Sequence, residues 1–136
     1  MYCTTHALVG GFTAGLGASP VTAFLGGLVS HLILDTVPHH DYYEVKWGVL
    51  DFLTAVSLVL FCKEKFVASP YFLSGAIGGA LPDLEVVLSH TTGKRRLIFP
   101  SHTGLTPHNR LKWPWGFFVQ VLVVVVAILC YIWFDG

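Results

Sequence analysis

Five apolar stretches separated by short polar segments set the pattern of the chain. They predict helices at about 5–16, 20–37, 45–62, 70–88 and 113–134. No stretch alternates apolar and polar residues, as a half-buried strand would. The last stretch carries no charged residue and a single glutamine, and about 20 apolar residues suffice to cross a bilayer. The pattern predicts an all-α integral membrane protein, a compact bundle of about five hydrophobic helices in a single membrane domain, residues 1–136.

Serine–proline pairs mark the expected starts of two helices, and one further proline marks an expected helix end. Ser19–Pro20 and Ser69–Pro70 each combine a capping side chain with a proline suited to a first helical turn, and Pro38 stops the second helix. The first stretch, about 12 residues, spans about 18 Å. It is therefore expected to be a half-span or a tilted re-entrant helix.

Composition supports a lipid environment. Hydrophobic residues make up 54% of the 136 residues and charged residues 12%, against a usual charged fraction of about 25%. A soluble domain of this size could not bury so much apolar surface, so the lipid bilayer is the expected partner. The net charge is zero, which gives no reason to expect a nucleic-acid partner. The oligomeric state is left open.

Small residues recur four positions apart within the expected helices. Such spacing lets membrane helices approach closely, although glycine is also generally common in these helices. The pairs are Gly11 and Gly15, Ala23 and Gly27, and Gly75 and Gly79.

Basic residues predict the orientation. If all five stretches cross, one face carries Lys46, Lys94, Arg95, Arg96, Arg110 and Lys112, and the other carries Lys63 and Lys65. The first face is then cytoplasmic by the positive-inside rule. All seven histidines are expected on this same face, at the ends of the helices and in the loops between them.

Histidines and carboxylates converge at this face. His31 and Asp35 are spaced i, i+4 and share a helix face, and Asp83 lies at a similar depth, about 20 Å along its helix. Pro82 is expected to open or kink that helix just before Asp83. Carboxylates within a membrane are costly unless they are paired or bound to something.

Neutral imidazoles and carboxylates together suit a divalent metal, with Zn expected first and Mn or Fe as alternatives. The candidates exceed four ligands, which predicts an open site or two metals. An ion pair of Asp35 with Lys46 or Arg95 is the alternative. The candidate metal ligands are His6, His31, Asp35, Asp83, His102, His108 and His39, with His40 and Asp41 held in reserve as ligands or as partners that orient the imidazoles.

Several motifs resemble the bacterial inner-membrane metal-dependent hydrolases of the YdjM-like family. THALVGG, GALPDLE and SHLILDTVP match family motifs through His6, Asp83 and the His31–Asp35 pair, and FPSHTGLTPHNR is similar to a histidine loop of the family. The loop here lacks an arginine after its first histidine, and Glu85 stands where the family has a second aspartate. The resemblance implies a hydrolase in a bacterial or archaeal cytoplasmic membrane.

The predicted function is hydrolysis by a metal-activated water at the cytoplasmic face, with a lipid ester or phosphoester as the expected substrate. Glu85 and Asp51 are the candidate catalytic side chains. Arg95, Arg96 and Arg110 are candidates to hold a phosphate, although the basic run at 94–96 is also a simple orientation signal. The alternative is a non-enzymatic membrane protein: a metal carrier, or a protein with a structural metal or a polar ion-pair cluster.

Overall fold

The protein is all-helical. The structure, a computed structural model, describes residues 1–14, 17–42, 44–93 and 97–135. The elements are α1 (Cys3–Val9), a π-helical turn η1 (Gly10–Ala14), α2 (Pro20–Thr36), α3 (Val45–Lys65), α4 (Phe72–Thr92), the short α5 (Pro100–Thr103) and α6 (Trp115–Asp135). Extended pairing among the described residues is limited to one isolated parallel bridge between His39 and Arg110.

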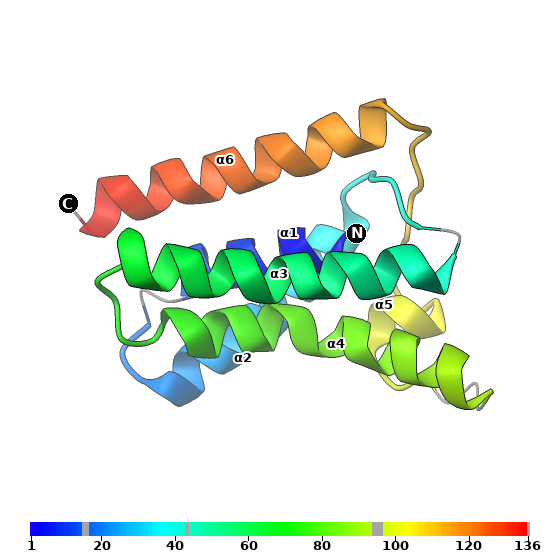
Figure 1. Cartoon of the computed structure of the whole chain (residues 1–136), viewed down its shortest axis with the longest axis horizontal. Coiled ribbons are helices and arrows are strands. Elements are labelled where there is room, and N and C mark those ends of the chain that lie inside the picture. Colours follow the sequence, from blue (N-terminus) through cyan, green and yellow to red (C-terminus); the bar gives the residue numbers. More distant parts are fainter. Residues whose placement is uncertain (15–16, 43, 94–96, 136) are drawn as a thin grey trace.

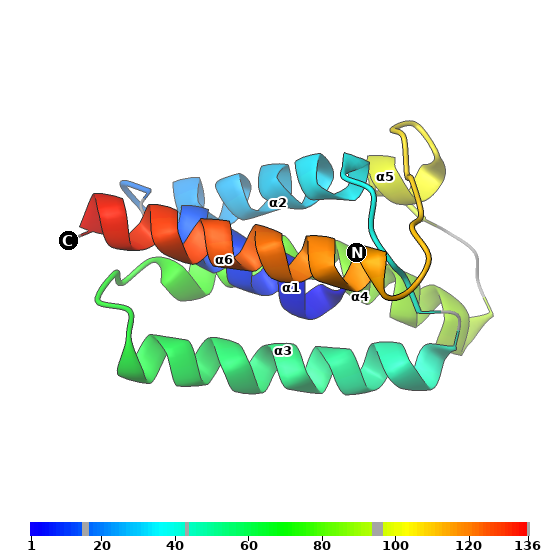
Figure 2. The same cartoon turned by 90° about the horizontal axis from the view of Figure 1, so that it is seen from above.

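The long helices lie side by side and alternate in direction (Figures 1 and 2). One end of the bundle gathers the N-terminus, the last turns of α2 and α4, the first turns of α3 and α6, and α5. We call this end the site end. The C-terminus lies at the opposite end.

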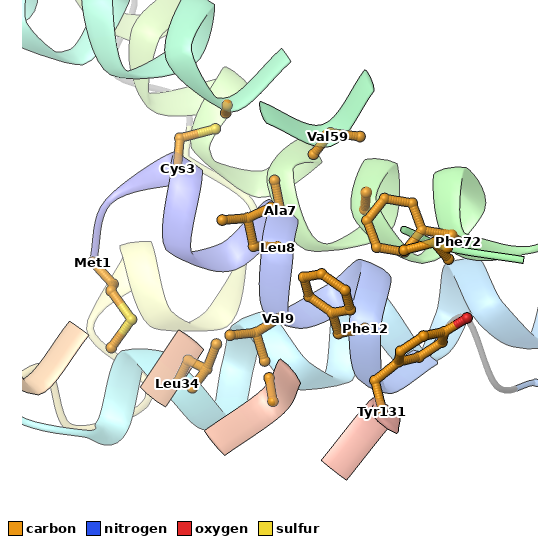
Figure 3. Close-up of a cluster of buried hydrophobic side chains, with 14 residues drawn as sticks. Met1, Cys3, Ala7, Leu8, Val9, Phe12, Leu34, Val59, Phe72 and Tyr131 are labelled. Carbon is orange, nitrogen blue, oxygen red and sulfur yellow. The ribbon is translucent and has the colours of Figure 1, made fainter. Parts of the chain in front are cut away.

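The first helix occupies the centre of the bundle (Figure 2). Six of its seven residues are buried, and its apolar side chains meet residues of four other helices. Phe12, just after α1, packs edge-on against Phe72 of α4 and Tyr131 of α6, with ring centroids 5.2 and 5.5 Å away. Figure 3 shows these three rings packed together in the interior, beside the side chains of α1. The segment expected to be a half-span or a tilted re-entrant helix is therefore a buried core element of the bundle.

Glycines bring α1, α2 and α4 into backbone contact. A methyl group at Gly27 would lie 2.8 Å from the backbone nitrogen of Gly79 and closer still to the carbonyl oxygen of Gly75. At Gly79 it would collide with the carbonyl oxygen of His6. Close packing by glycine is thus confirmed for these positions. It brings His6, on α1, against the α4 backbone.

Three helices are long and apolar enough to span a membrane: Val45–Lys65, Phe72–Thr92 and Trp115–Phe134. Helix α2 is apolar but shorter. Large apolar side chains such as Leu53, Leu60 and Leu122 point out of the bundle and are exposed. Such outward-facing apolar surface is typical of helices solvated by lipid.

Of the two helix starts predicted at Ser–Pro pairs, the start of α2 is confirmed and the start of α4 is shifted. At α2, Ser19 accepts a hydrogen bond from the backbone N–H of Thr22 and Pro20 lies in the first turn, so this prediction is confirmed. Helix α4 begins at Phe72 instead of Pro70. There the Ser69 hydroxyl accepts from the N–H of Tyr71, which closes a turn and delays the helix by two residues.

Candidate metal centre

Five side chains from four helices meet inside the site end. We call them the central cluster: His6 of α1, His31 and Asp35 of α2, Asp83 of α4 and His102 of α5. Two groups within it, His6–His31–Asp83 and His31–Asp35–His102, each bring one potential ligand atom per residue within 4.8 Å of the others. The sequence therefore predicted residues that the fold places together.

His31 is oriented by the backbone of a neighbouring helix. Its Nδ1 lies 2.7 Å from the carbonyl oxygen of Gly79. Because a carbonyl only accepts hydrogen bonds, Nδ1 carries the proton and the lone pair of the neutral ring is on Nε2. That Nε2 lies 3.2 Å from Oδ2 of Asp35. Both atoms are buried without a hydrogen-bond partner, so with the ring neutral two acceptors face each other, an arrangement that a bound cation would stabilise.

His6 approaches the same carboxylate from α1. Its Nε2 lies 3.1 Å from Oδ1 of Asp35. Its ring stacks on that of His31, with centroids 3.6 Å apart and an interplanar angle of 17°. Both imidazoles are fully buried, and Nδ1 of His6 has no hydrogen-bond partner. Two stacked histidines therefore present nitrogen atoms to one aspartate.

His102 is held in place by Glu85. Its Nδ1 lies 3.0 Å from Oε1 of Glu85, and the carboxylate also accepts from the backbone N–H groups of Ile98 and Phe99, both at 2.9 Å. With the proton on Nδ1, Nε2 of His102 faces the cluster, 3.7 Å from Oδ2 of Asp35. Burial lowers the pKa of His102, and the hydrogen bond with Glu85 offsets this only in part. The ring is therefore neutral near pH 7 and able to bind a metal.

Asp83 of α4 contributes a second carboxylate to the central cluster. Its Oδ1 lies 4.0 Å from Nε2 of His102, and its Oδ2 is buried without a hydrogen-bond partner. Helix α4 runs on through Pro82 to Thr92. Since proline has no N–H, the Gly78 carbonyl lacks its usual donor here.

A second group, the loop cluster of His39, Asp41 and His108, lies beside Asp35. Asp41 contacts Nε2 of His39 at 2.9 Å through Oδ1 and Nε2 of His108 at 2.7 Å through Oδ2. Burial raises the pKa of Asp41, but hydrogen bonds with His108 and His39 and the positive N-terminus outweigh it, so the pKa is well below its usual range. Asp35, His39 and His108 form a third group of potential ligands within 4.8 Å.

Backbone pairing positions the loop cluster. The N–H of His39 donates to the Asn109 carbonyl at 3.1 Å, and the N–H of Leu111 donates to the His39 carbonyl at 2.7 Å. These bonds fix the 104–112 loop against the 38–42 loop. Nδ1 of His39 lies 2.6 Å from the Val37 carbonyl, which leaves its Nε2 lone pair facing the cluster.

The amino group of Met1 lies between the two clusters. It is 2.6 Å from Nε2 of His39, 2.9 Å from Oδ1 of Asp41 and 3.3 Å from Oδ1 of Asp35. A positive charge thus already occupies the space that these three side chains surround.

The remaining predicted residues lie outside the central cluster. The Asp51 carboxylate accepts from the Thr4 hydroxyl at 2.6 Å and the Thr4 N–H at 3.3 Å, so it joins α3 to α1. Arg110 donates to Asp41 at 3.0 Å. Arg95 and Arg96 lie outside the described residues. The catalytic roles predicted for Asp51 and Glu85 stay predictions, and the contacts of both show positioning.

The ion-pair alternative for Asp35 does not involve Lys46. The Lys46 ammonium lies 2.6 Å from Glu44 at the surface, whereas Asp35 contacts His6, His31 and the Met1 amino group.

Gln120 is a buried residue to which the sequence analysis gave no role. Its side-chain oxygen accepts from the N–H of Tyr2 at 2.7 Å, and its amide nitrogen donates to the His40 carbonyl at 3.0 Å. It thereby ties α6 to both segments that border the site. The signal was present, because it is the single polar side chain in an otherwise apolar stretch.

A cavity of about 670 Å³ reaches the clusters from between α3 and α4. Its polar wall includes Asp83, His102, Asp41, His108 and Arg110. Its apolar wall is formed by Val45, Phe52, Val86, Val87 and Leu97. The site is therefore reachable by a molecule that has one polar and one apolar part.

The spacing of the donor atoms is compatible with a bound metal ion. Two ligands bound at 2.0–2.2 Å with tetrahedral angles lie about 3.3–3.6 Å apart, close to the 3.2 and 3.7 Å that separate Asp35 Oδ2 from His31 and His102. Each of these histidines donates its other ring N–H to an oxygen, as metal-bound histidines almost always do.

No family model, curated protein or solved structure matches the chain. The resemblance to the YdjM-like hydrolases therefore stays a hypothesis based on short motifs.

Proposed function

We propose that the protein is an integral membrane hydrolase that depends on a divalent metal and acts on an ester or phosphoester of a lipid. One observation carries the proposal: acceptor atoms of His31 and Asp35 face each other at 3.2 Å, buried and without a hydrogen-bond partner. A buried lone pair against a buried carboxylate is costly unless a cation lies between them.

The central cluster would hold the ion. His6, His31, Asp35, Asp83 and His102 supply its ligands, and Zn, Mn and Fe are all compatible with this mixture of nitrogen and oxygen donors. A bound divalent metal supplies Lewis-acid activation and lowers the pKa of water to about 7. The hydrogen bonds from His31 to Gly79 and from His102 to Glu85 fix the rings before the ion arrives.

Hydrolysis joins the oxygen of water to the phosphorus or carbonyl carbon, breaks the bond to the alcohol and leaves a water proton on that alcohol. The cavity wall contributes Arg110, which can pair with a phosphate once it turns from Asp41. The apolar wall from α3 and α4 accepts an acyl chain. This pairing of polar and apolar walls, together with the three helices long and apolar enough to span a bilayer, supports a lipid substrate.

The positive-inside rule favours the cytoplasmic side for this end of the bundle. Lys46, Arg110 and Lys112 belong to the site end, and Lys63 and Lys65 to the opposite end. The proposed location is thus the cytoplasmic membrane of a prokaryote, with the site at its inner face.

A metal-free network of histidine and aspartate is the alternative that one observation favours, because the Met1 amino group already neutralises part of the charge of Asp35 and Asp41. A metal carrier is less well supported. It needs a polar path through the bundle, whereas Phe12, Phe72 and Tyr131 pack together beyond the site (Figure 3).

The experiment measures metal content by mass spectrometry on protein purified in detergent. Wild type is compared with the double variant His31→Ala, Asp83→Ala and with His90→Ala, which changes an exposed histidine that lines the cavity but belongs to neither cluster. We expect metal in wild type and in His90→Ala and none in the double variant. Wild type carrying metal is then assayed with lipid phosphoesters and esters. Absence of metal in all three proteins, even after incubation with Zn or Mn, would overturn the proposal.

A further inference from the structure

The loop cluster has the features of a cation site in its own right. His39 is fully buried, and its Nε2 faces Oδ1 of Asp41 at 2.9 Å. His108 contacts the other oxygen of Asp41, and its ring meets that of His39 edge-on with centroids 4.6 Å apart. Two imidazoles and a carboxylate, from the 38–42 and 104–112 loops, therefore surround one small space.

Asp35 connects this space to the central cluster. It shares one group of potential ligands with His31 and His102, and another with His39 and His108. Its Oδ2 faces His31, and its Oδ1 faces His6 and the Met1 amino group. One carboxylate thus borders two spaces, as does a bridging ligand in sites with two metals.

The charge in the loop cluster favours a cation. Asp35 is buried and Asp41 is partly buried, with 16% of its side chain exposed, and the positively charged amino group of Met1 lies between them. Arg110 adds a contact to Asp41 from the exposed side. A divalent ion in the same space would replace one positive charge with two, against the two carboxylates that border it.

We propose that the protein binds a second divalent cation at His39, Asp41 and His108, with Asp35 shared between this ion and the one in the central cluster. The proposal rests on the proposed function only through the shared Asp35. Paired metals are typical of enzymes that cleave phosphoesters, because two ions can stabilise both the attacking and the leaving oxygen. The inferred substrate class therefore narrows to a phosphoester with an apolar chain.

The test counts bound Mn²⁺ on the full-length protein in detergent, after removal of metal and equilibration with Mn²⁺ alone. The variants are His108→Gln, His39→Ala with His108→Ala, and His90→Ala as a matched control. Electron paramagnetic resonance supplies a second readout, since two Mn²⁺ ions sharing a carboxylate are magnetically coupled. Circular dichroism and thermal unfolding identify any variant that fails to fold.

We expect two ions per chain and a coupled spectrum for wild type and His90→Ala. His108→Gln and the double variant should retain one ion and give an uncoupled spectrum. One ion in wild type, unchanged in the variants, would overturn the second site and leave the proposed function standing. Two ions retained in a folded double variant would overturn the assigned ligands. No ion in wild type would remove both proposals together.

Discussion

The contact between Glu85 and His102 leads to a quantitative prediction. Glu85→Gln removes the negative charge that fixes the imidazole of His102 while keeping the size of the side chain. The original carboxylate accepts three hydrogen bonds, from His102 and from the N–H groups of Ile98 and Phe99. The glutamine amide keeps one oxygen acceptor for them, and its nitrogen cannot accept.

The magnitude follows from the single bond to His102. A hydrogen bond to a charged group contributes about 1.5–3 kcal/mol, and about 1.4 kcal/mol corresponds to a factor of ten in affinity. We therefore expect metal affinity to fall about 10–100-fold, which agrees with the usual effect of removing a residue that orients a metal ligand. The bundle should stay folded, because the hydrogen bonds of Glu85 to described residues all go to the 98–102 segment and Glu85 lies outside the apolar core.

The assay is a competition titration of Zn²⁺ between the protein and a fluorescent chelator, which gives the dissociation constant directly. Glu64→Gln, the same substitution on an exposed residue near the far end of α3, serves as the control and should leave affinity unchanged. An unaltered dissociation constant in folded Glu85→Gln would refute the positioning role. If activity then disappeared with metal still bound, the alternative role of Glu85 as a base would be favoured.

Three further predictions concern packing, polar contacts and metal removal. Gly27→Ala should lower the free energy of unfolding by about 1–3 kcal/mol through overpacking against α4, whereas Gly48→Ala, with nothing within 4 Å, should not destabilise; thermal unfolding in detergent compares them. Gln120→Leu should cost about 1–2 kcal/mol through its lost bonds to the N-terminal segment and the 38–42 loop, and an unchanged melting temperature would contradict this. Free Zn²⁺ at 100 times its dissociation constant should stabilise the protein by about 2.7 kcal/mol, an effect that a chelator reverses and that His31→Ala lacks.

Much of the central cluster could be predicted because helical geometry determines it. The i, i+4 spacing places His31 and Asp35 on one face of α2. Pro20, near the start of α2, sets the depth at which they lie in the bundle. The all-helical fold followed from the absence of any alternating pattern. Periodicity does not show which helix lies at the centre of the bundle. The short first helix was expected to be a half-span or a tilted re-entrant helix, and it lies at the centre.

The roles of Glu85 and Asp51 depended on contacts that no local pattern specifies. Glu85 binds backbone N–H groups 13 and 14 residues further along the chain, and Asp51 binds Thr4 across 47 residues. Carboxylates near a suspected metal site resemble bases in a sequence, and only the fold shows which of them hold other groups in place. The separation of the loop cluster from the central cluster likewise depends on the pairing of His39 with the 109–111 segment.

The central position of α1 has a consequence for how the protein is made. His6 is synthesised well before α6, yet α6 packs against the helix that carries His6. At the site end, Gln120 of α6 forms hydrogen bonds with both the N-terminal segment and the 38–42 loop. A chain whose α6 has not yet packed therefore lacks the bonds that join the N-terminal segment to the 38–42 loop through Gln120. We therefore expect the proposed metal site to be complete only once α6 has packed, which would delay metal binding until late in folding.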